Sequence, residues 1–476
     1  MRCFNFSHTP SRRALLRQSA CGFAGVSLAA IAGECSGVQG VRSSGVTDPE
    51  LRLPLPHLAA RARRVIFLFM WGGPSHVDLF DFKPRLNDFD GKPVTPEAFG
   101  GKQPPGGTIL GSPFQFRQHG ESGVQISELF PELSRHADRL CVIRSMHTDG
   151  SAHGEALLNL HTGHSNLLRP SVGAWVSYGL GSESENLPAF ITISPPRGHG
   201  GVQNYGSAFL PATHQGTAIG AAEVPIAKAK ISNLTNSLID RSTQREQLNL
   251  IQMLNRQHLQ SVQADQGIEG LIAGYELAFR MQSAIPQIMS LSDETQETLN
   301  LYGVDQEPTN NFARQCLLAR KFAEQGVRYI QVSTDYTWDH HNKNNEGLRK
   351  ECSQVDRPIA GLLTDLHQRG LLEDTLVVWG SEFGRTPTVE NGDGRNHHPA
   401  AFTMWMAGGG VRGGLTYGST DDFGFHPVEN PVHMHDFHAT LLYALGLDHK
   451  RLTYRFAGRD FRLTDVSGIV QKELFS

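Results

Sequence analysis

The 476-residue sequence has few cysteines and no long apolar stretch beyond its N-terminal region. Of its six cysteines, three lie in the first 35 residues and the others are Cys141, Cys316 and Cys352. This odd, widely spaced set allows at most one disulfide and lacks the CxxC spacing of a cysteine metal site. No later segment reaches the ~18 uninterrupted apolar residues of a membrane-spanning helix. We therefore expect no stable membrane insertion of the mature chain.

The sequence also lacks an excess of positive charge. Its formal net charge is -4, and residues 1–46 contain five Arg and one Glu, so the remainder carries -8. A negative chain repels nucleic acid and anionic lipid, so we expect no nucleic-acid partner. A content of 39% hydrophobic and 19% charged residues, with 50 Gly and 25 Pro, excludes a disordered, collagen-like or coiled-coil chain.

The N-terminal region has the pattern of an export signal. Ser11–Arg17 (SRRALLR) is basic and precedes Gly22–Ala32, an apolar run too short to span a bilayer. This arrangement resembles a twin-arginine signal, with a membrane anchor or a disordered tail as the alternative. We interpret residues 1–46 as a signal and linker, and we predict a periplasmic or secreted protein.

The rest of the chain alternates between short apolar, β-branched runs and helical patterns. Strands are predicted at 64–70, 139–145, 188–193, 328–334, 375–380 and 401–407, and helices at about 244–262, 267–284, 310–325, 354–369 and 434–445. This order predicts an α/β domain over residues 60–476, with a mainly parallel sheet covered by helices on both faces. We interpret the segment at about 220–300 as a helical insertion.

Polar side chains gather where the predicted strands end. In open α/β sheets, ligands bind beyond the carboxyl ends of the strands. Asp339 and His341 follow one strand, Glu382 follows another, and His397 precedes a third. We expect these four side chains to share one site. A mixture of carboxylates and imidazoles suits Zn²⁺ or Mn²⁺, whereas Ca²⁺ and Mg²⁺, the alternatives, favour oxygen ligands alone.

Other acidic residues near strand ends are open to two interpretations. An Asp after a strand is usually a turn or N-cap residue. Asp78, after the first strand, is the candidate metal ligand there, and Asp81 is its rival, although Asp81-Phe82-Lys83-Pro84 also has the pattern of a turn. We interpret Asp436, near the start of the last helix, as an N-cap rather than a ligand.

Several motifs resemble those of a known superfamily. Leu372–Arg385 (LEDTLVVWGSEFGR) resembles the strand of sulfatases and alkaline phosphatases that ends in a metal-binding Asp-His-Gly, with Glu382 at the Asp position and Phe383 at the His position. Ala156–Gly163 (ALLNLHTG) is similar to the tail of the sulfatase nucleophile motif, which places His153 where a sulfatase has its modified Cys.

A closer resemblance covers residues 60–475. The segments FMWGGPSHVDLFDFKP at 69–84, WDHH at 338–341 and SEFGRTP at 381–387 are similar to those of the family called domain of unknown function 1501, which is abundant in planctomycetes and usually carries twin-arginine signals. This resemblance implies an alkaline phosphatase-like fold. It also implies metal-dependent hydrolysis of a sulfate or phosphate ester, on an anionic small molecule or a polysaccharide.

The resemblance also suggests roles for individual residues. The implied metal ligands are Asp78, Asp339, His341, Glu382 and His397. His153 or Ser151 would lie at the point of attack, and Arg385 would bind the anionic oxygens. The sulfatase motif Cys-x-Pro-Ser-Arg is absent, which removes formylglycine formation and leaves Ser151 or a water as the nucleophile. The alternative is a binding or structural protein that keeps the fold without the chemistry.

Overall fold

The structure is a computed structural model, and it describes residues 56–95, 106–229, 238–261 and 266–476. The predicted signal and linker, residues 1–46, lie outside these ranges. The strands of the central sheet are β1 (Arg64–Phe69), β4 (Leu140–His147), β5 (Phe190–Ile193), β6 (Thr217–Ile219), β7 (Tyr329–Ser333), β8 (Thr375–Gly380), β11 (Phe402–Ala407), β12 (Leu415–Tyr417) and β15 (Val432–His433).

Smaller strands and the helices complete the described part of the chain. Two-stranded sheets are formed by β2 (Phe116–His119) with β3 (Val124–Ser127), β9 (Gly384–Arg385) with β10 (His397–His398), β13 (Ser419–Thr420) with β14 (Pro427–Glu429), and β16 (Tyr454–Phe456) with β17 (Arg459–Phe461). The α-helices are α2 (His76–Leu79), α3 (Pro84–Asp88), α4 (His153–Thr162), α5 (Val172–Leu180), α6 (Arg241–Ser261), α7 (Gln266–Met289), α8 (Gln296–Tyr302), α9 (Asn310–Glu324), α10 (Asn344–Gln368) and α11 (Met434–Ala444).

The central sheet is mainly parallel, as the sequence predicts. Its order is β12-β4-β11-β8-β1-β7-β5-β6, with β15 paired to the end of β4. Strand β11 runs antiparallel to both β4 and β8, and the other pairings of the described strands within this sheet are parallel. The carboxyl ends of β1, β4, β5, β7 and β8 therefore meet at one edge. The mixed α/β fold is thus confirmed.

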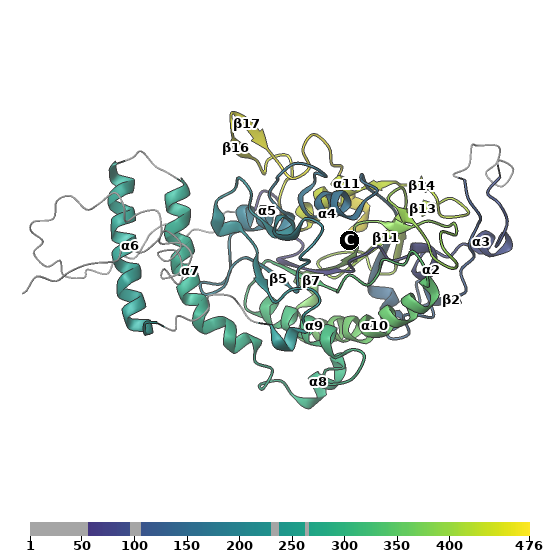
Figure 1. Cartoon of the computed structure of the whole chain (residues 1–476), viewed down its shortest axis with the longest axis horizontal. Helices are drawn as coiled ribbons and strands as arrows, with labels where there is room; N and C mark the ends of the chain where they lie inside the picture. The colour runs from purple at the N-terminus through teal and green to yellow at the C-terminus, as the bar shows by residue number, and fades with distance from the viewer. Residues whose placement is uncertain (1–55, 96–105, 230–237, 262–265) are drawn as a thin grey trace, which may run out of the picture.

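Helices cover both faces of this sheet, because successive strand residues point to opposite sides. Ile66 and Leu68 of β1 belong to a buried cluster with apolar residues of α9 and α10. Val65 and Phe67 belong to a second cluster with residues of α4, α5 and α11. Figure 1 shows α9 and α10 on one side of the sheet and α4, α5 and α11 on the other.

Helix α10 begins earlier than the sequence predicts, whereas α11 begins at Met434 as predicted but has a different N-cap. Helix α10 begins ten residues earlier, at Asn344, because Leu348, Cys352 and Val355 continue its buried face toward the N-terminus and Pro358 is accommodated inside the helix. In α11, the N-cap is His433. Asp436 occupies the third helical position, where its Oδ2 accepts from the backbone N–H of His433 in a capping box. The expectation that Asp436 is the N-cap was therefore wrong in position.

The segment predicted as a helical insertion contains α6 and α7. These two long helices lie side by side at the left of Figure 1, away from the edge where the strand ends meet. In the described ranges no helix is both long and apolar enough to cross a membrane. Cys141, Cys316 and Cys352 are buried and free of disulfides.

A glycine at the end of β1 allows three strand ends to approach closely. Gly72 has a φ of 128°, and a Cβ added there would lie 2.6 Å from the backbone N of Asp339, after β7. Its N–H donates to Oε1 of Glu382, after β8, at 3.1 Å. The chain beyond β1 is therefore in direct contact with the two loops that carry candidate ligands.

Candidate metal centre

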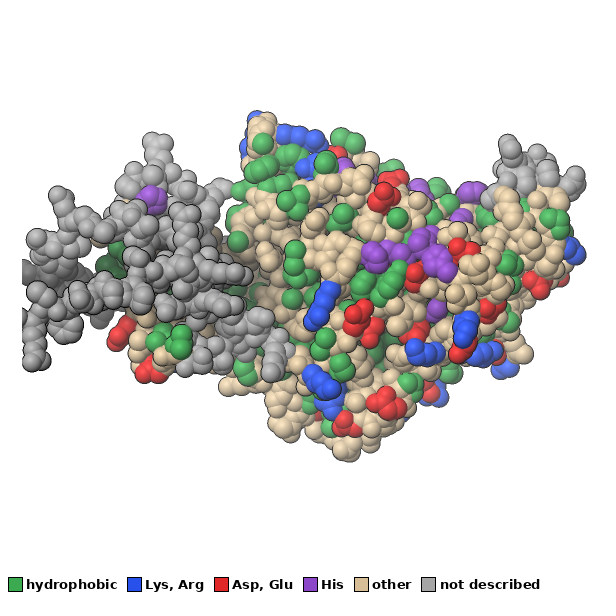
Figure 2. Space-filling view, viewed as in Figure 1, with side chains coloured by type: hydrophobic (Ala, Val, Ile, Leu, Met, Phe, Trp, Pro, Cys, Tyr) green, Lys and Arg blue, Asp and Glu red, His purple; other side chains and the backbone are tan. Residues whose placement is uncertain are grey.

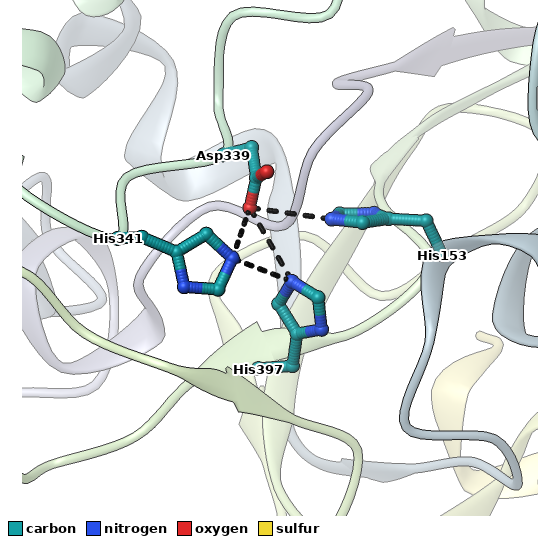
Figure 3. Close-up of side chains that lie close together, drawn as sticks. All are labelled: His153, Asp339, His341 and His397. Carbon is teal, nitrogen blue, oxygen red and sulfur yellow. Dashed lines mark hydrogen bonds and ion pairs between the residues drawn. The ribbon is translucent and has the colours of Figure 1, made fainter. Parts of the chain in front are cut away.

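Four side chains from three parts of the chain converge at this edge of the sheet. His153 is the first residue of α4, Asp339 and His341 lie in the loop after β7, and His397 begins β10. One donor atom from each residue, a carboxylate oxygen or an imidazole nitrogen, lies within 4.8 Å of the other three. Figure 3 shows the three rings directed toward the carboxylate of Asp339. We call these four residues the His/Asp cluster.

The spacing within the His/Asp cluster suits one metal ion. Oδ1 of Asp339 lies 3.2 Å from Nε2 of His153, 3.0 Å from Nε2 of His341 and 3.3 Å from Nε2 of His397. The Nε2 atoms of His341 and His397 are 2.9 Å apart. Ligands held at about 2.0–2.2 Å in a tetrahedral zinc site have donor atoms about 3.3 Å apart. These four distances lie near that value.

The opposite side of each ring is held by an oxygen that can only accept a hydrogen bond. Nδ1 of His153 donates to Oε1 of Glu382 at 2.7 Å, and Nδ1 of His341 donates to Oε2 of Glu390 at 2.5 Å. Nδ1 of His397 donates to the backbone carbonyl of Ser151 at 2.8 Å. Each Nδ1 therefore carries a hydrogen, which makes Nε2 of each neutral ring an acceptor.

Three nitrogen lone pairs and a carboxylate oxygen consequently face one point. When the rings are neutral, no hydrogen lies among these four donor atoms, so a cation is needed to bring them together. Nε2 of His153 is buried and has no hydrogen-bond partner. Fixing a ring through its Nδ1–H is the usual support of a metal-binding histidine. The residues present thus fit a divalent metal ion.

In the ion-free protein, protons take over part of this role. Burial lowers the pKa of His153, but the nearby carboxylates of Asp339 and Glu382 outweigh burial and raise that pKa above its ordinary value. Burial opposes the charge of Asp339, yet His153, His397 and Arg385 hold its pKa well below the usual range. The site therefore stays anionic at the carboxylate and competes for a positive charge.

Glu382 lies one contact away from the cluster rather than in it. Its buried carboxylate accepts from His153, from the backbone of Gly72 and from the hydroxyl of Ser381 at 2.5 Å. The predicted ligand is thus a support for His153, while His153, predicted at the point of attack, supplies a donor atom. Glu382 and His153 thus have each other's predicted positions. Glu382 is held back from the cluster because its carboxylate accepts from the backbone of Gly72, just beyond β1.

Asp78 does not join the cluster. Nε and Nη2 of Arg395 donate to its two oxygens at 2.8 and 3.1 Å, and the hydroxyl of Ser75 donates at 2.6 Å. Both side chains of this ion pair are fully buried. Its rival, Asp81, lies 3.1 Å from Nζ of Lys83 and is also outside the cluster. Because Arg395 donates to both carboxylate oxygens of Asp78, this carboxylate is not available to a metal ion.

Arg385 faces the protein, not open space. Its buried guanidinium donates to the carbonyls of Gly73 and Arg395 at 2.9 and 3.1 Å, and to the carbonyl of Gly72 and Oδ1 of Asp339. All of its nitrogens are thus engaged, so in this structure it orients Asp339 and does not present its fork to an anion. Ser151 is exposed, and its backbone carbonyl orients His397.

Three residues around the site were not found from the sequence. Tyr336 donates its hydroxyl to Oδ2 of Asp339 at 2.7 Å, and burial together with that carboxylate raises its pKa, which keeps the hydroxyl protonated. Glu390 supports His341 across 49 residues of sequence. His199 is exposed and stacks at 5.3 Å on His153. Of these three residues, only Tyr336 could have been suspected from its position, because it lies in the same loop as Asp339.

Known proteins resemble the chain at the level of family and fold. The model of a family described as "Protein of unknown function (DUF1501)" matches residues 62–475. No curated protein matches the chain. Similar solved structures include the PsFucS1 sulfatase from Pseudoalteromonas sp., with 12% identity, 87% of this chain and 72% of that chain covered, and a TM-score of 0.39.

Two further solved structures are similar to a comparable extent. Ps i-CgsB, in complex with k-i-k-neocarrahexaose, has 10% identity, with 81% of this chain and 72% of that chain covered, and a TM-score of 0.39. A TAB5 alkaline phosphatase mutant with Mg bound in its M3 site has 11% identity, with 74% of this chain and 92% of that chain covered, and a TM-score of 0.32. The similar structures thus include a sulfatase and an alkaline phosphatase.

Proposed function

The chain belongs to the family described as protein of unknown function (DUF1501), and we propose that it is a metal-dependent hydrolase of sulfate or phosphate esters. The observation that carries this proposal is the convergence of three imidazole Nε2 atoms on Oδ1 of Asp339, each ring held through its Nδ1–H. The resemblance of Leu372–Arg385 to the sulfatase and alkaline phosphatase strand supports the reaction class.

The donor set favours Zn²⁺, with Mn²⁺ next. Three nitrogens and one carboxylate oxygen match the preference of Zn²⁺, whereas Ca²⁺ and Mg²⁺ take oxygen ligands. A divalent ion held there would offset the negative charge of the ester oxygens and make a water a better nucleophile. His153, Asp339, His341 and His397 hold the ion in this proposal, and Glu382, Glu390 and Arg385 orient them.

A substrate can approach the cluster from the solvent. The side chain of His341 is 32% exposed and that of Asp339 is 19% exposed. Figure 2 shows histidine side chains gathered at the surface near the middle of the molecule. The exposed hydroxyl of Ser151, in the loop between β4 and α4, is the candidate side-chain nucleophile, and a water is the other.

A second candidate function is a binding protein that holds one ion without chemistry. Phe383 favours this alternative, because its buried ring stacks on His397 at a centroid distance of 4.5 Å and lies 4.8 Å from that of His153. An aromatic ring there covers one side of the cluster with an apolar surface. It occupies the position at which the related strand of sulfatases and alkaline phosphatases has a metal-binding His.

The proposal is tested by purifying the protein without chelator, measuring bound metal by elemental analysis, and assaying chromogenic sulfate and phosphate monoesters and a phosphodiester. We expect about one Zn²⁺ or Mn²⁺ per chain and hydrolysis that stops in Asp339→Asn. Bound metal without hydrolysis of any ester would favour the binding protein. A protein that takes up no metal would contradict both functions.

We also propose that the chain is exported by the twin-arginine route. The basis is the pair Arg12-Arg13 ahead of the apolar run Gly22–Ala32. Replacing both arginines by lysine keeps the charge but removes the pair that a receptor reads, so the protein is expected to stay in the cytoplasm. Cell fractionation measures this, and unchanged export of the double variant would count against the route.

A further inference from the structure

A surface cavity lies at the start of α11, beside the loop that leads to the metal centre. Its volume is about 630 Å³. It is lined by His433, Asp436, Lys450, Arg462, Val466, Ser467, Gly468 and Ile469. These residues belong to α11, its N-cap and the C-terminal segment, and none of them belongs to the His/Asp cluster.

The lining combines two available cations with exposed apolar side chains. Within the described part of the chain, neither Lys450 nor Arg462 forms an ion pair with a carboxylate. The one acid in the lining, Asp436, accepts from the backbone N–H groups of His433 and Ile469 at 3.1 and 2.7 Å, so both its oxygens are engaged. Val466 and Ile469 are 84% and 69% exposed. The exposed Lys450 and the half-buried Arg462 therefore adjoin an apolar surface.

Contacts connect this cavity to the metal centre. Nε2 of His433 lies 3.3 Å from Oδ2 of Asp149, and the ring of His433 lies 5.0 Å from that of His147 at the end of β4. Two residues beyond Asp149, the carbonyl of Ser151 accepts from His397 of the cluster at 2.8 Å. Two residues of extended chain span at most ~7 Å. Residues 149–151 therefore contact His433 of the cavity lining at one end and His397 of the cluster at the other.

We propose that this cavity is a second anion-binding subsite, which takes a sulfate or phosphate group of a carbohydrate polymer whose neighbouring ester lies at the His/Asp cluster. The placement of a neighbouring ester at the His/Asp cluster rests on the proposed function. Lys450 and Arg462 bind the oxyanion, and Val466 and Ile469 pack on the C–H face of a sugar ring. A carbohydrate carries both features on one chain, whereas an inorganic polyphosphate offers charge alone.

The test compares the full chain with its Lys450→Gln and Lys450→Gln/Arg462→Gln variants. Binding of a heparin-derived hexasaccharide is measured by calorimetry at low salt. The double variant is expected to bind about tenfold more weakly, the size expected for two exposed ion pairs. Because Arg462 also contacts the carbonyl of Asp465, the single variant and a melting curve show whether the loss reflects local unfolding.

A charge-matched control separates the subsite from general attraction. Lys228 and Arg256 are exposed and lie on η5 (Ile226–Lys228) and α6, and Lys228→Gln/Arg256→Gln removes the same charge elsewhere. This control is expected to bind the hexasaccharide as the unmodified protein does. Equal losses in the two double variants would overturn the proposal. Equal affinity of the unmodified protein for a polyphosphate of matched charge would overturn the carbohydrate assignment.

Kinetics separate failure of the subsite from failure of the proposed function. For a sulfated oligosaccharide substrate, the double variant is expected to have a KM raised about tenfold and an unchanged kcat, while hydrolysis of a small chromogenic ester is unaffected. A protein that hydrolyses no ester but loses hexasaccharide binding in the double variant would retain the subsite and lose the hydrolase. If the unmodified protein hydrolyses esters and the double variant binds the oligosaccharide unchanged, the hydrolase is retained and the subsite is lost.

Discussion

Nδ1 of His153 lies 2.7 Å from Oε1 of the buried Glu382, and this contact decides which of the two residues faces the metal centre. Because Glu382 accepts the Nδ1 hydrogen, Nε2 of His153 is left as an acceptor directed at Asp339. The carboxylate acts through the ring. Glu382 lies just after β8 and His153 begins α4, so their contact ties these two segments together.

Glu382→Gln should weaken metal binding without abolishing it. An amide still offers one oxygen to His153, but it removes the charge that supports the ring. Loss of such a supporting contact typically costs about 10–100-fold in metal affinity. Competition against a chelator of known affinity measures the change. An affinity equal to that of the unmodified protein would contradict the supporting role.

Asp339→Asn should abolish metal binding and any ester hydrolysis while leaving a folded protein. The substitution keeps the volume but replaces the anionic oxygen toward which three Nε2 atoms point. The matched control is Asp422→Asn, which removes an exposed carboxylate paired with Arg85 at the surface. Bound metal, hydrolysis and circular dichroism are measured for both variants. Full metal content in Asp339→Asn would place the ion elsewhere.

Removing the metal ion should lower the melting temperature. A ligand bound only by the native state adds RT ln(1 + [L]/Kd) to the free energy of unfolding, which is about 2.7 kcal/mol at 100 times Kd. Chelator should remove this stabilisation, and added Zn²⁺ or Mn²⁺ should restore it. His341→Ala, which lacks one donor, should show a much smaller response. A melting curve indifferent to chelator in the unmodified protein would argue strongly against the site.

Metal affinity should fall as the pH falls. Asp339 and Glu382 raise the pKa of His153 in the ion-free protein, against the effect of burial, so the ion must displace a proton at pH values below that pKa. The proton stabilises the ion-free fold at low pH, and this contribution is lost as the pH rises through the raised pKa. Metal affinity measured from pH 5 to 8 should therefore weaken below that pKa, and in Glu382→Gln the decline should begin at lower pH. A pH-independent affinity would exclude this coupling.

Asp78→Asn should lower the stability of the fold, and its main effect should not be on metal binding. It leaves the fully buried Arg395 without its anionic partner, and breaking a buried pair costs about 3–5 kcal/mol. Burial opposes the charge of Asp78, but Arg395 lowers its pKa, so this stabilisation is lost as the pH falls through that lowered value. Urea unfolding at pH 7 measures the loss. A variant that unfolds like the unmodified protein but binds no metal would make Asp78 a ligand instead.

Local patterns in the sequence predict the scaffold. The strand segments are recognisable because each is a short apolar run whose residues are buried on both faces of a parallel sheet. Once the strands are parallel, their carboxyl ends share an edge, and this places Asp339 and His341, after β7, near Glu382, after β8. His397 precedes β11 and reaches the same edge because β11 runs antiparallel to β4 and β8. The sequence therefore determines that a mixed carboxylate and imidazole site forms there.

Only the tertiary structure decides which side chain does what within that neighbourhood. Glu382 and His153 are 229 residues apart, and Asp78 and Arg395 are 317 apart, so no local pattern relates them. Whether Glu382 or His153 faces the cluster depends on how closely the chain at Gly72 approaches the loops after β7 and β8. Periodicity reports which face of an element is buried. The partner of a buried charge is set by the packing of segments that are distant in the sequence.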